Sequence, residues 1–168
     1  MNAYKFLRVG GVGIFSGFGW PLPNGSPGAW IDAEIDPCRS GVHAARVADL
    51  PYWLGPELYE VELGGRVTEL DHKVVAERGR LVRRIEAWND DTRDAYSLMC
   101  VGRAQELAAA SPPRLEPWAP VPEAIGAGPA LMGYIASRIA EEIGGTEALD
   151  AERTHQAGWL AERLGLTP

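Results

Sequence analysis

The sequence predicts an α+β fold, in which a small twisted antiparallel or mixed sheet from the N-terminal half packs against C-terminal helices. Two observations predict it. Runs of aromatic and β-branched residues dominate up to Trp88, whereas apolar residues recur at three- and four-residue spacings after Asp90. Hydrophobic residues make up 46% of the 168 residues and charged residues 23%, which is the balance of a folded chain. We therefore expect residues 1–90 to form a sheet-containing core and residues 91–168 a helical part that packs on it as one domain.

Four segments are expected to form the sheet: residues 3–9, 41–45, 58–63 and 80–87. The third is the clearest, because Tyr59, Val61 and Leu63 alternate with more polar residues. Its expected end is a tight turn at Gly64-Gly65, and residues 73–76 are a further strand candidate. Acidic residues of the third strand, Glu60 and Glu62, are expected to lie opposite Arg80 or Arg84 of the fourth as a ladder of ion pairs.

Two segments connect these strands. Residues 10–37 alternate Gly, Pro, Asn and Ser with aromatic side chains, which predicts a long structured loop pinned by buried aromatics. Residues 48–54 predict a brief helix. Gly55-Pro56 ends it, because proline disfavours helical geometry in the preceding residue and glycine suits a C-terminal cap.

Three helices are expected in the second half: residues 92–110, a helix that begins near Pro129 and stops at Gly144-Gly145, and residues 146–164. A Pro-rich linker, residues 111–122, separates the first from the second. The second helix carries a four-residue stripe that predicts a buried seam, formed by Leu131, Ile135, Ile139 and Ile143. This helical tail either folds back on its own sheet or packs against a second copy in a homodimer.

Charge and cysteine content exclude several classes of protein. The net charge of −7 disfavours a nucleic-acid or anionic-membrane binder, because both need a basic surface. Cys38 and Cys100 are too few for a disulfide scaffold, and no apolar run of signal-peptide type follows the first basic residues. We expect free thiols, a cytoplasmic location, and no nucleic-acid or membrane partner. Arginine outnumbers lysine by fourteen to two, which indicates codon bias from a GC-rich genome.

Two familiar site motifs are missing. The glycines between Gly10 and Gly19 lack the G-x-G-x-x-G spacing and are followed by Trp20-Pro21 instead of a helix, which excludes a dinucleotide or phosphate loop. Asp36, Cys38 and His43 lie close in sequence but lack metal-ligand spacing, so no metal site is expected.

His43 is the leading candidate for a functional residue. It lies in a predicted strand just ahead of a short helix, and histidine is the side chain best suited to proton transfer near neutral pH. Aromatic residues of the same half predict a cleft that stacks on a planar ligand, and the candidates for its lining are Tyr4, Trp20, Tyr52 and Trp53.

Residues 40–65, SGVHAARVADLPYWLGPELYEVELGG, carry a resemblance to an uncharacterised domain family of bacteria and phages. Its members share a G-[FIV]-H-A strand, a short aromatic-rich helix and a Y-x-V-E strand that ends in glycine. The order of these pieces also resembles the core of ADP-ribosyltransferase-like proteins. That resemblance implies an NAD cleft with Tyr4 and Lys5 on its first strand, His43 on its second, and Glu62 of an E-x-E spacing as the candidate catalytic carboxylate.

The sequence leaves two classes of function open. One is a small enzyme or binding protein that acts on NAD or another nucleotide-like small molecule, with His43 and Glu62 as catalytic residues. The other is a non-catalytic protein-interaction module. Fold alone does not decide between them, because one fold supports many functions.

Overall fold

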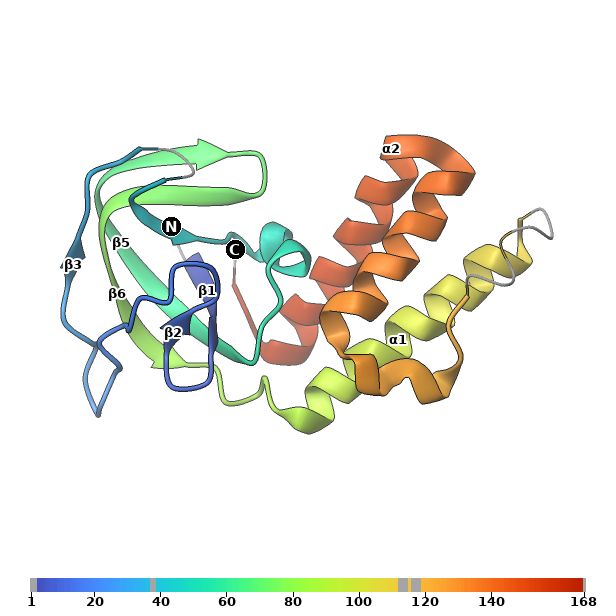
Figure 1. Ribbon diagram of the computed structural model, residues 1–168, viewed down its shortest axis with the longest axis horizontal. Coiled ribbons are helices and arrows are strands. Elements are labelled where there is room, and N and C mark those ends of the chain that lie inside the picture. The colour runs from blue at the N-terminus through green and yellow to red at the C-terminus, as the bar shows by residue number, and fades with distance from the viewer. Residues whose placement is uncertain (1–2, 37–38, 112–114, 116–118, 168) are drawn as a thin grey trace. The chain divides into compact units, whose positions relative to one another are not determined.

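The computed structural model describes residues 3–36, 39–111, 115 and 119–167. The chain divides into two compact units. The sheet unit comprises Met1–Trp88 and Leu164–Pro168, and the helical unit comprises Asn89–Arg163. An antiparallel sheet in the first and helices in the second confirm the predicted α+β class (Figure 1).

The described residues of the sheet unit form six strands and one short 3-10 helix. They are β1 (Ala3–Arg8), β2 (Val12–Gly13), β3 (Ile31–Asp32), β4 (Val42–Ala44), the 3-10 helix η1 (Val47–Tyr52), β5 (Glu57–Leu70) and β6 (Lys73–Arg84). Neighbouring strands are antiparallel and follow the order β2-β1-β5-β6-β3, with β4 also paired to β6.

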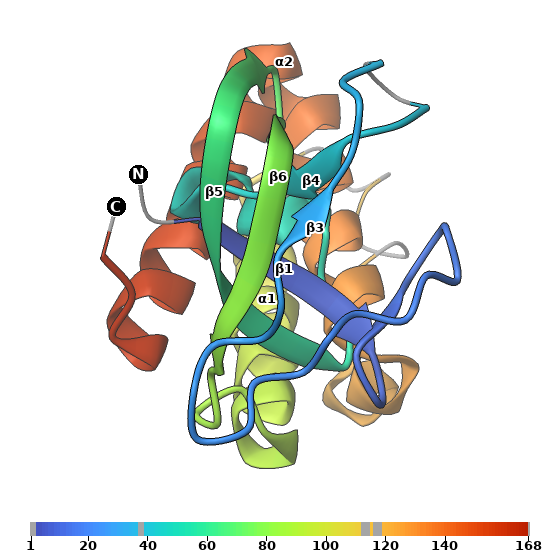
Figure 2. The ribbon, with the colours of Figure 1, turned by 90° about the vertical axis from the view of Figure 1, so that its left-hand side faces the viewer.

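The sheet curls until the end of β4 meets β1. Just beyond β4, Ala45 exchanges two backbone hydrogen bonds with Tyr4 of β1, at N···O distances of 2.8 and 2.7 Å. Pairing therefore runs in a circuit from β1 through β5, β6 and β4 back to β1, and Figure 2 shows the strands wrapping round. The interior of this circuit is the place where inward-facing side chains collect.

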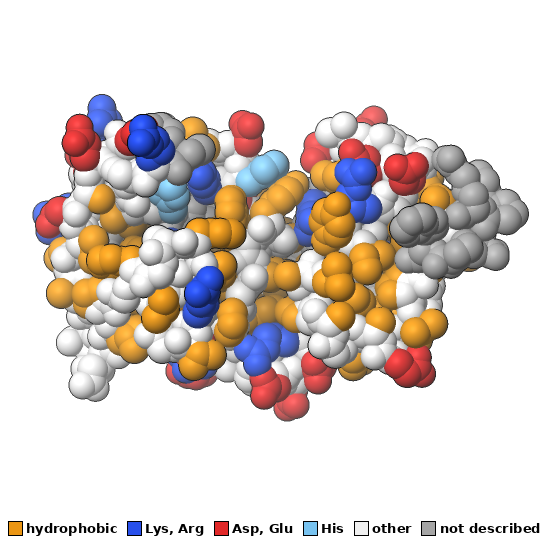
Figure 3. Space-filling model, viewed as in Figure 1, with side chains coloured by type: hydrophobic (Ala, Val, Ile, Leu, Met, Phe, Trp, Pro, Cys, Tyr) orange, Lys and Arg blue, Asp and Glu red, His pale blue; other side chains and the backbone are white. Residues whose placement is uncertain are grey.

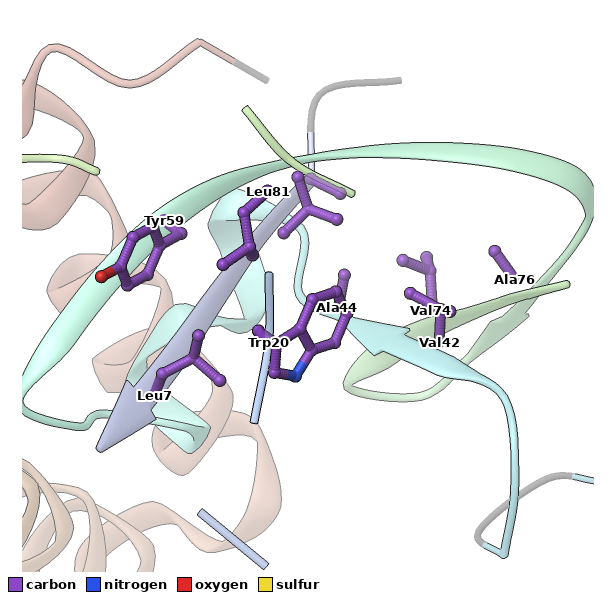
Figure 4. Close-up of a cluster of buried hydrophobic side chains, with 10 residues drawn as sticks. Leu7, Trp20, Val42, Ala44, Tyr59, Val74, Ala76 and Leu81 are labelled. Atoms are coloured by element: carbon purple, nitrogen blue, oxygen red, sulfur yellow. The ribbon is translucent and has the colours of Figure 1, made fainter. Parts of the chain in front are cut away.

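Alternation along the strands selects the side chains that fill the interior. Ala3 and Leu7 of β1 belong to one buried cluster with Trp20 from the long loop and with residues of β4, β5 and β6 (Figure 4). Residue 5 lies between Ala3 and Leu7 on the same face of β1. A lysine, Lys5, occupies this position.

The predicted strand end at Gly64-Gly65 is wrong, because β5 continues to Leu70. Gly65 has a φ of +72°, and the pairing register with β6 shifts between Gly64 and Val67. The glycines therefore form a bulge that bends the strand. The hairpin turn lies instead at Asp71-His72, and the segments 73–76 and 80–87 predicted as separate strands are largely covered by the continuous β6.

The predicted ladder of ion pairs across this hairpin is confirmed in part, because Glu62 pairs with Arg80 as predicted but Glu60 pairs with Arg83. Arg80 lies 2.7 Å from Glu62 and Arg83 lies 2.7 Å from Glu60. These side chains are partly exposed, so each pair contributes about 0.2–1 kcal/mol.

The helical unit contains α1 (Asp90–Ala109), the 3-10 helix η3 (Pro122–Ala127) and α2 (Pro129–Leu164, whose last residue belongs to the sheet unit). The side chain of Asn89 caps α1 by accepting a hydrogen bond from the Thr92 amide at 3.0 Å. The predicted break at Gly144-Gly145 is confirmed. Both glycines have non-helical backbone angles there, and α2 forms two arms that lie side by side in Figure 1.

The stripe predicted as a buried seam of α2 is wrong in part. Leu131 and Ile143 are 45% and 46% exposed, because a strict four-residue spacing drifts away from the 3.6-residue period of a helix. Ile139 is buried as predicted, and the other buried residues of this face are Met132, Ala136 and Ala140.

A buried polar network links the helices of this unit through Gln156. Its side-chain nitrogen donates to Gly133 O at 3.1 Å and Glu152 Oε1 at 3.0 Å, and its oxygen accepts from the Tyr96 hydroxyl at 3.0 Å. Satisfied networks of this kind fix the register of packed helices, because each lost partner leaves a buried polar group unpaired. Among the described residues, no helix is long and apolar enough to cross a membrane.

Candidate functional site: a cavity beside Lys5

The sheet unit contains a cavity of about 480 Å³. Its walls come from β1, from β4 and from the loop that leads from β2 to Trp20. The side chains that matter for its chemistry are Lys5, Trp20, His43, Trp53 and Lys73. Figure 3 shows hydrophobic and histidine side chains gathered on one face of this unit.

Lys5 is placed on the inner face of β1 by the alternation described above. Its Nζ donates a hydrogen bond to the His43 carbonyl at 2.6 Å and lies 5.2 Å from the centre of the Trp20 ring. No carboxylate within the described part of the chain forms an ion pair with it. Burial, and then the positive charge of Lys73, lower the pKa of Lys5 to about 8.

Lys73 begins β6 and lines the same cavity, with its Nζ 5.9 Å from the centre of the Trp53 ring. Lys5 and Lys73 are the two lysines of the chain, against fourteen arginines. Both amines therefore belong to one site. An amine differs from a guanidinium in that it can lose its proton near neutral pH and act as a base or nucleophile.

His43 lines the cavity from β4, and its Nε2 is buried without a hydrogen-bond partner among the described residues. Burial lowers the pKa of this imidazole, and the charges of Lys73 and Lys5 lower it further, whereas a hydrogen bond with the backbone of Ser40 raises it. The net shift is downward. The neutral form of His43 therefore predominates at pH 7, and a neutral imidazole has a nitrogen that can accept a proton from a ligand.

Aromatic rings form the apolar side of the site. Phe18 meets Trp20 edge to face at a centroid distance of 6.0 Å, and Phe15 meets Trp53 in the same way at 6.2 Å. Trp20 is buried, whereas Phe15 is 85% and Phe18 47% exposed. The aromatic wall thus extends from the interior of the sheet unit to its surface.

Other charged groups in the lining have partners outside it. Asp32 forms an ion pair with Arg78 at 3.4 Å, and Arg39 lies 3.9 Å from Asp36. The acidic residue of the lining is thereby compensated, which leaves the character of the cavity basic and aromatic.

The structure brings together most of the residues that the sequence predicted for a site. Trp20, His43 and Trp53 line the cavity, and so does Tyr4, whose hydroxyl donates to the Thr167 carbonyl at 3.1 Å. Tyr52 lies outside the lining and stacks on His72 with ring centres 3.9 Å apart.

Glu62 is not brought to His43. It lies outside the cavity lining, on the partly exposed face of the β5–β6 hairpin, where it pairs with Arg80. Its role as a catalytic carboxylate stays a prediction that this geometry does not support.

Sequence reasoning did not single out Lys5 and Lys73 as a pair. The sequence offered one indication, the rarity of lysine: the chain has fourteen arginines but only two lysines, Lys5 and Lys73. The two lysines lie 68 positions apart and belong to no known motif, so spacing alone could not join them.

The thiols and acids of the described residues form no further reactive group. Cys100 is buried, and burial raises the pKa of its thiol to about 12, which makes it unreactive at neutral pH. Cys38, considered with Asp36 and His43 above, lies outside the described residues. No group of three or more His, Cys, Asp or Glu in the described part of the chain is placed to hold a metal ion.

Comparison of the chain with protein-family models, with curated proteins and with solved structures finds no match. The two resemblances described from the sequence therefore stay predictions, and the function has to be inferred from the chemistry of the cavity.

Proposed function

We propose that the sheet unit binds a small anionic ligand with a planar ring, NAD or another nucleotide-like molecule, in the cavity beside Lys5. The observation that carries this proposal is the convergence of both lysines of the chain on one aromatic-lined cavity.

Charge supports the anionic part of the ligand. A partly buried ammonium group without a carboxylate partner is held away from water at a cost in free energy, and a second ammonium nearby raises that cost. A phosphate or carboxylate of a ligand would offset both effects. The chain as a whole carries a net charge of −7, so this basic cavity stands out from its surroundings.

The aromatic wall supports the planar part. Trp20 and Phe18 offer ring faces and edges beside the amines, and aromatic rings of proteins stack on the rings of bases and nicotinamides. A volume of about 480 Å³ lies within the usual range for small-molecule sites.

The alternative, a non-catalytic protein-interaction module, is favoured by one observation. Phe15 is 85% exposed beside Trp53, and a large apolar side chain on a surface is typical of a docking site. The two functions predict different behaviour toward small molecules, because only the first requires a ligand to enter the cavity.

Thermal unfolding in the presence of AMP, ADP-ribose and NAD separates them. A ligand that binds only the folded protein stabilises it by about 2.7 kcal/mol at 100 times its Kd. We expect at least one of these compounds to raise the melting temperature of the wild type. Lys5→Met should abolish the rise, because it removes the amine and keeps most of the apolar side chain.

Arg83→Met is the matched control. It also removes one positive charge, but its side chain pairs with Glu60 on the hairpin and does not line the cavity. Its ligand response should equal that of the wild type. If none of the three compounds at millimolar concentration moves the melting temperature, the interaction module is supported and the proposal is wrong.

A further inference from the structure

We propose that Lys5 is a reactive amine that forms an imine with an aldehyde or ketone group of the ligand, with His43 relaying the proton. This inference rests on the proposed function, because the same cavity must admit the ligand, and it names the chemical class of that ligand as an anionic carbonyl compound.

The geometry provides the first argument. The Lys5 amine lies at the wall of the cavity between an aromatic ring and a carbonyl oxygen, with no carboxylate of the described residues to hold it as an ion pair. One of its hydrogens is directed to the His43 carbonyl at 2.6 Å, which fixes the direction of the side chain. A neutral amine held in this way keeps its lone pair for a ligand.

The protonation state provides the second. A pKa of about 8 leaves about a quarter of the Lys5 side chains neutral at pH 7.5, whereas an ordinary lysine with a pKa of 10.5 is neutral in about one molecule in a thousand. The fraction of nucleophilic amine is therefore raised about 200-fold. Desolvation and a second cation are the means by which proteins activate a lysine for imine chemistry.

Lys73 supplies a separate function at the same site. It lines the cavity with its Nζ 5.9 Å from the centre of the Trp53 ring, and a positive charge at this place attracts a phosphate or carboxylate of the ligand. A division of labour follows, in which Lys73 attracts the anionic group and Lys5 attacks the carbonyl carbon.

The reaction balances without any further reactant. The Lys5 nitrogen lone pair forms a bond to the carbonyl carbon, and the carbonyl oxygen takes up a proton while the nitrogen loses one, which gives a carbinolamine. That intermediate then loses its hydroxyl group and the remaining nitrogen proton as water, which leaves the imine. The unpaired Nε2 of His43, buried in the same wall, is the group that accepts the proton from nitrogen and returns it to the departing hydroxyl.

Labelling with aldehydes and reduction with borohydride tests this inference. The probes are pyridoxal 5′-phosphate, which is anionic, aromatic and an aldehyde, and propanal, which is an aldehyde alone. Reduction converts each imine to a stable secondary amine, and mass spectrometry of peptides then separates Lys5, Lys73 and the N-terminal amine. We expect Lys5 to react at least tenfold faster than Lys73 with both probes.

Three variants sharpen the measurement. Lys5→Arg keeps the charge and should remove the fast label, whereas Lys73→Arg should keep it. His43→Gln should slow the labelling of Lys5 several-fold without lowering its final extent, since a proton relay affects the rate alone. Circular dichroism of each variant confirms that it is folded.

The outcomes separate this inference from the proposed function. Pyridoxine 5′-phosphate has an alcohol in place of the aldehyde, so a rise in melting temperature with this compound reports binding without imine formation. Binding of pyridoxine 5′-phosphate with equal labelling of Lys5 and Lys73 would overturn the imine and leave the proposed function standing. Fast labelling of Lys5 by propanal with no binding of any anionic aromatic compound would support the reactive amine and contradict the proposed ligand.

Discussion

Replacement of Lys5 by methionine should change how the stability of the protein depends on pH. The pKa of Lys5 is about 8 in the folded protein and 10.5 in an unfolded chain. Between these values the unfolded state binds more protons than the folded state, so the free energy of unfolding rises with pH. Integrated from pH 7 to pH 10, this linkage contributes about 2.5 kcal/mol.

Urea unfolding followed by tryptophan fluorescence measures the effect. Four of the six tryptophans lie in the sheet unit: Trp20, Trp30, Trp53 and Trp88. The stability of the wild type relative to Lys5→Met should grow by about 2.5 kcal/mol from pH 7 to pH 10, because all other titrating groups are common to both proteins. The free energy of unfolding of Arg83→Met should differ from that of the wild type by the same amount at every pH. Parallel pH profiles for the wild type and Lys5→Met would refute the assignment of a low pKa to this amine.

Three further predictions concern the fold. Gly65→Ala should lower the free energy of unfolding by about 1–3 kcal/mol, and by more than Gly17→Ala. Both glycines have a positive φ, but only at Gly65 would the added Cβ approach another side chain, that of Glu77 on β6, at 2.8 Å. Equal losses of stability in urea unfolding would contradict the bulge at Gly65. Gln156→Leu should cost about 2–4 kcal/mol because it leaves several buried polar groups unpaired, whereas Thr154→Ala on the exposed side should cost less than 1 kcal/mol. Cys100, in a variant without the other cysteine, should resist a thiol reagent at pH 8 until the protein is unfolded by guanidinium, and rapid reaction of the folded protein would show that the thiol is not buried as described.

Local patterns predicted much of the sheet and the helices. Aromatic and branched residues identified β1, alternation identified the first half of β5, and glycine with proline identified the helix boundaries at Pro129 and Gly144-Gly145. The turn assigned to Gly64-Gly65 failed for a physical reason. A positive φ serves a tight turn and a bulge equally well, and only the pairing with β6 decides between them.

The site could be predicted only in part, because its key residue depends on contacts distant in sequence. The stretch around Lys5, AYKFLRV, does not reveal which side of the strand faces inward, since both sides carry apolar residues. Closure of the sheet by Ala45, forty residues later, turns the side of Lys5 toward Trp20 and His43. His43 was identified because histidine is the side chain best suited to proton transfer near neutral pH, whereas a lone lysine in a strand is ordinarily a surface residue.

The most direct test of the cavity as an anion-binding site is an NMR titration of protein labelled with ¹³C at the lysine Cε. The labelled side chains are Lys5 and Lys73 alone, and Lys73→Arg assigns them. Addition of AMP or NAD should shift both signals and raise the pKa of Lys5 above its value of about 8, because a bound phosphate stabilises the ammonium form. Signals and a pKa that stay unchanged at millimolar ligand would contradict the account.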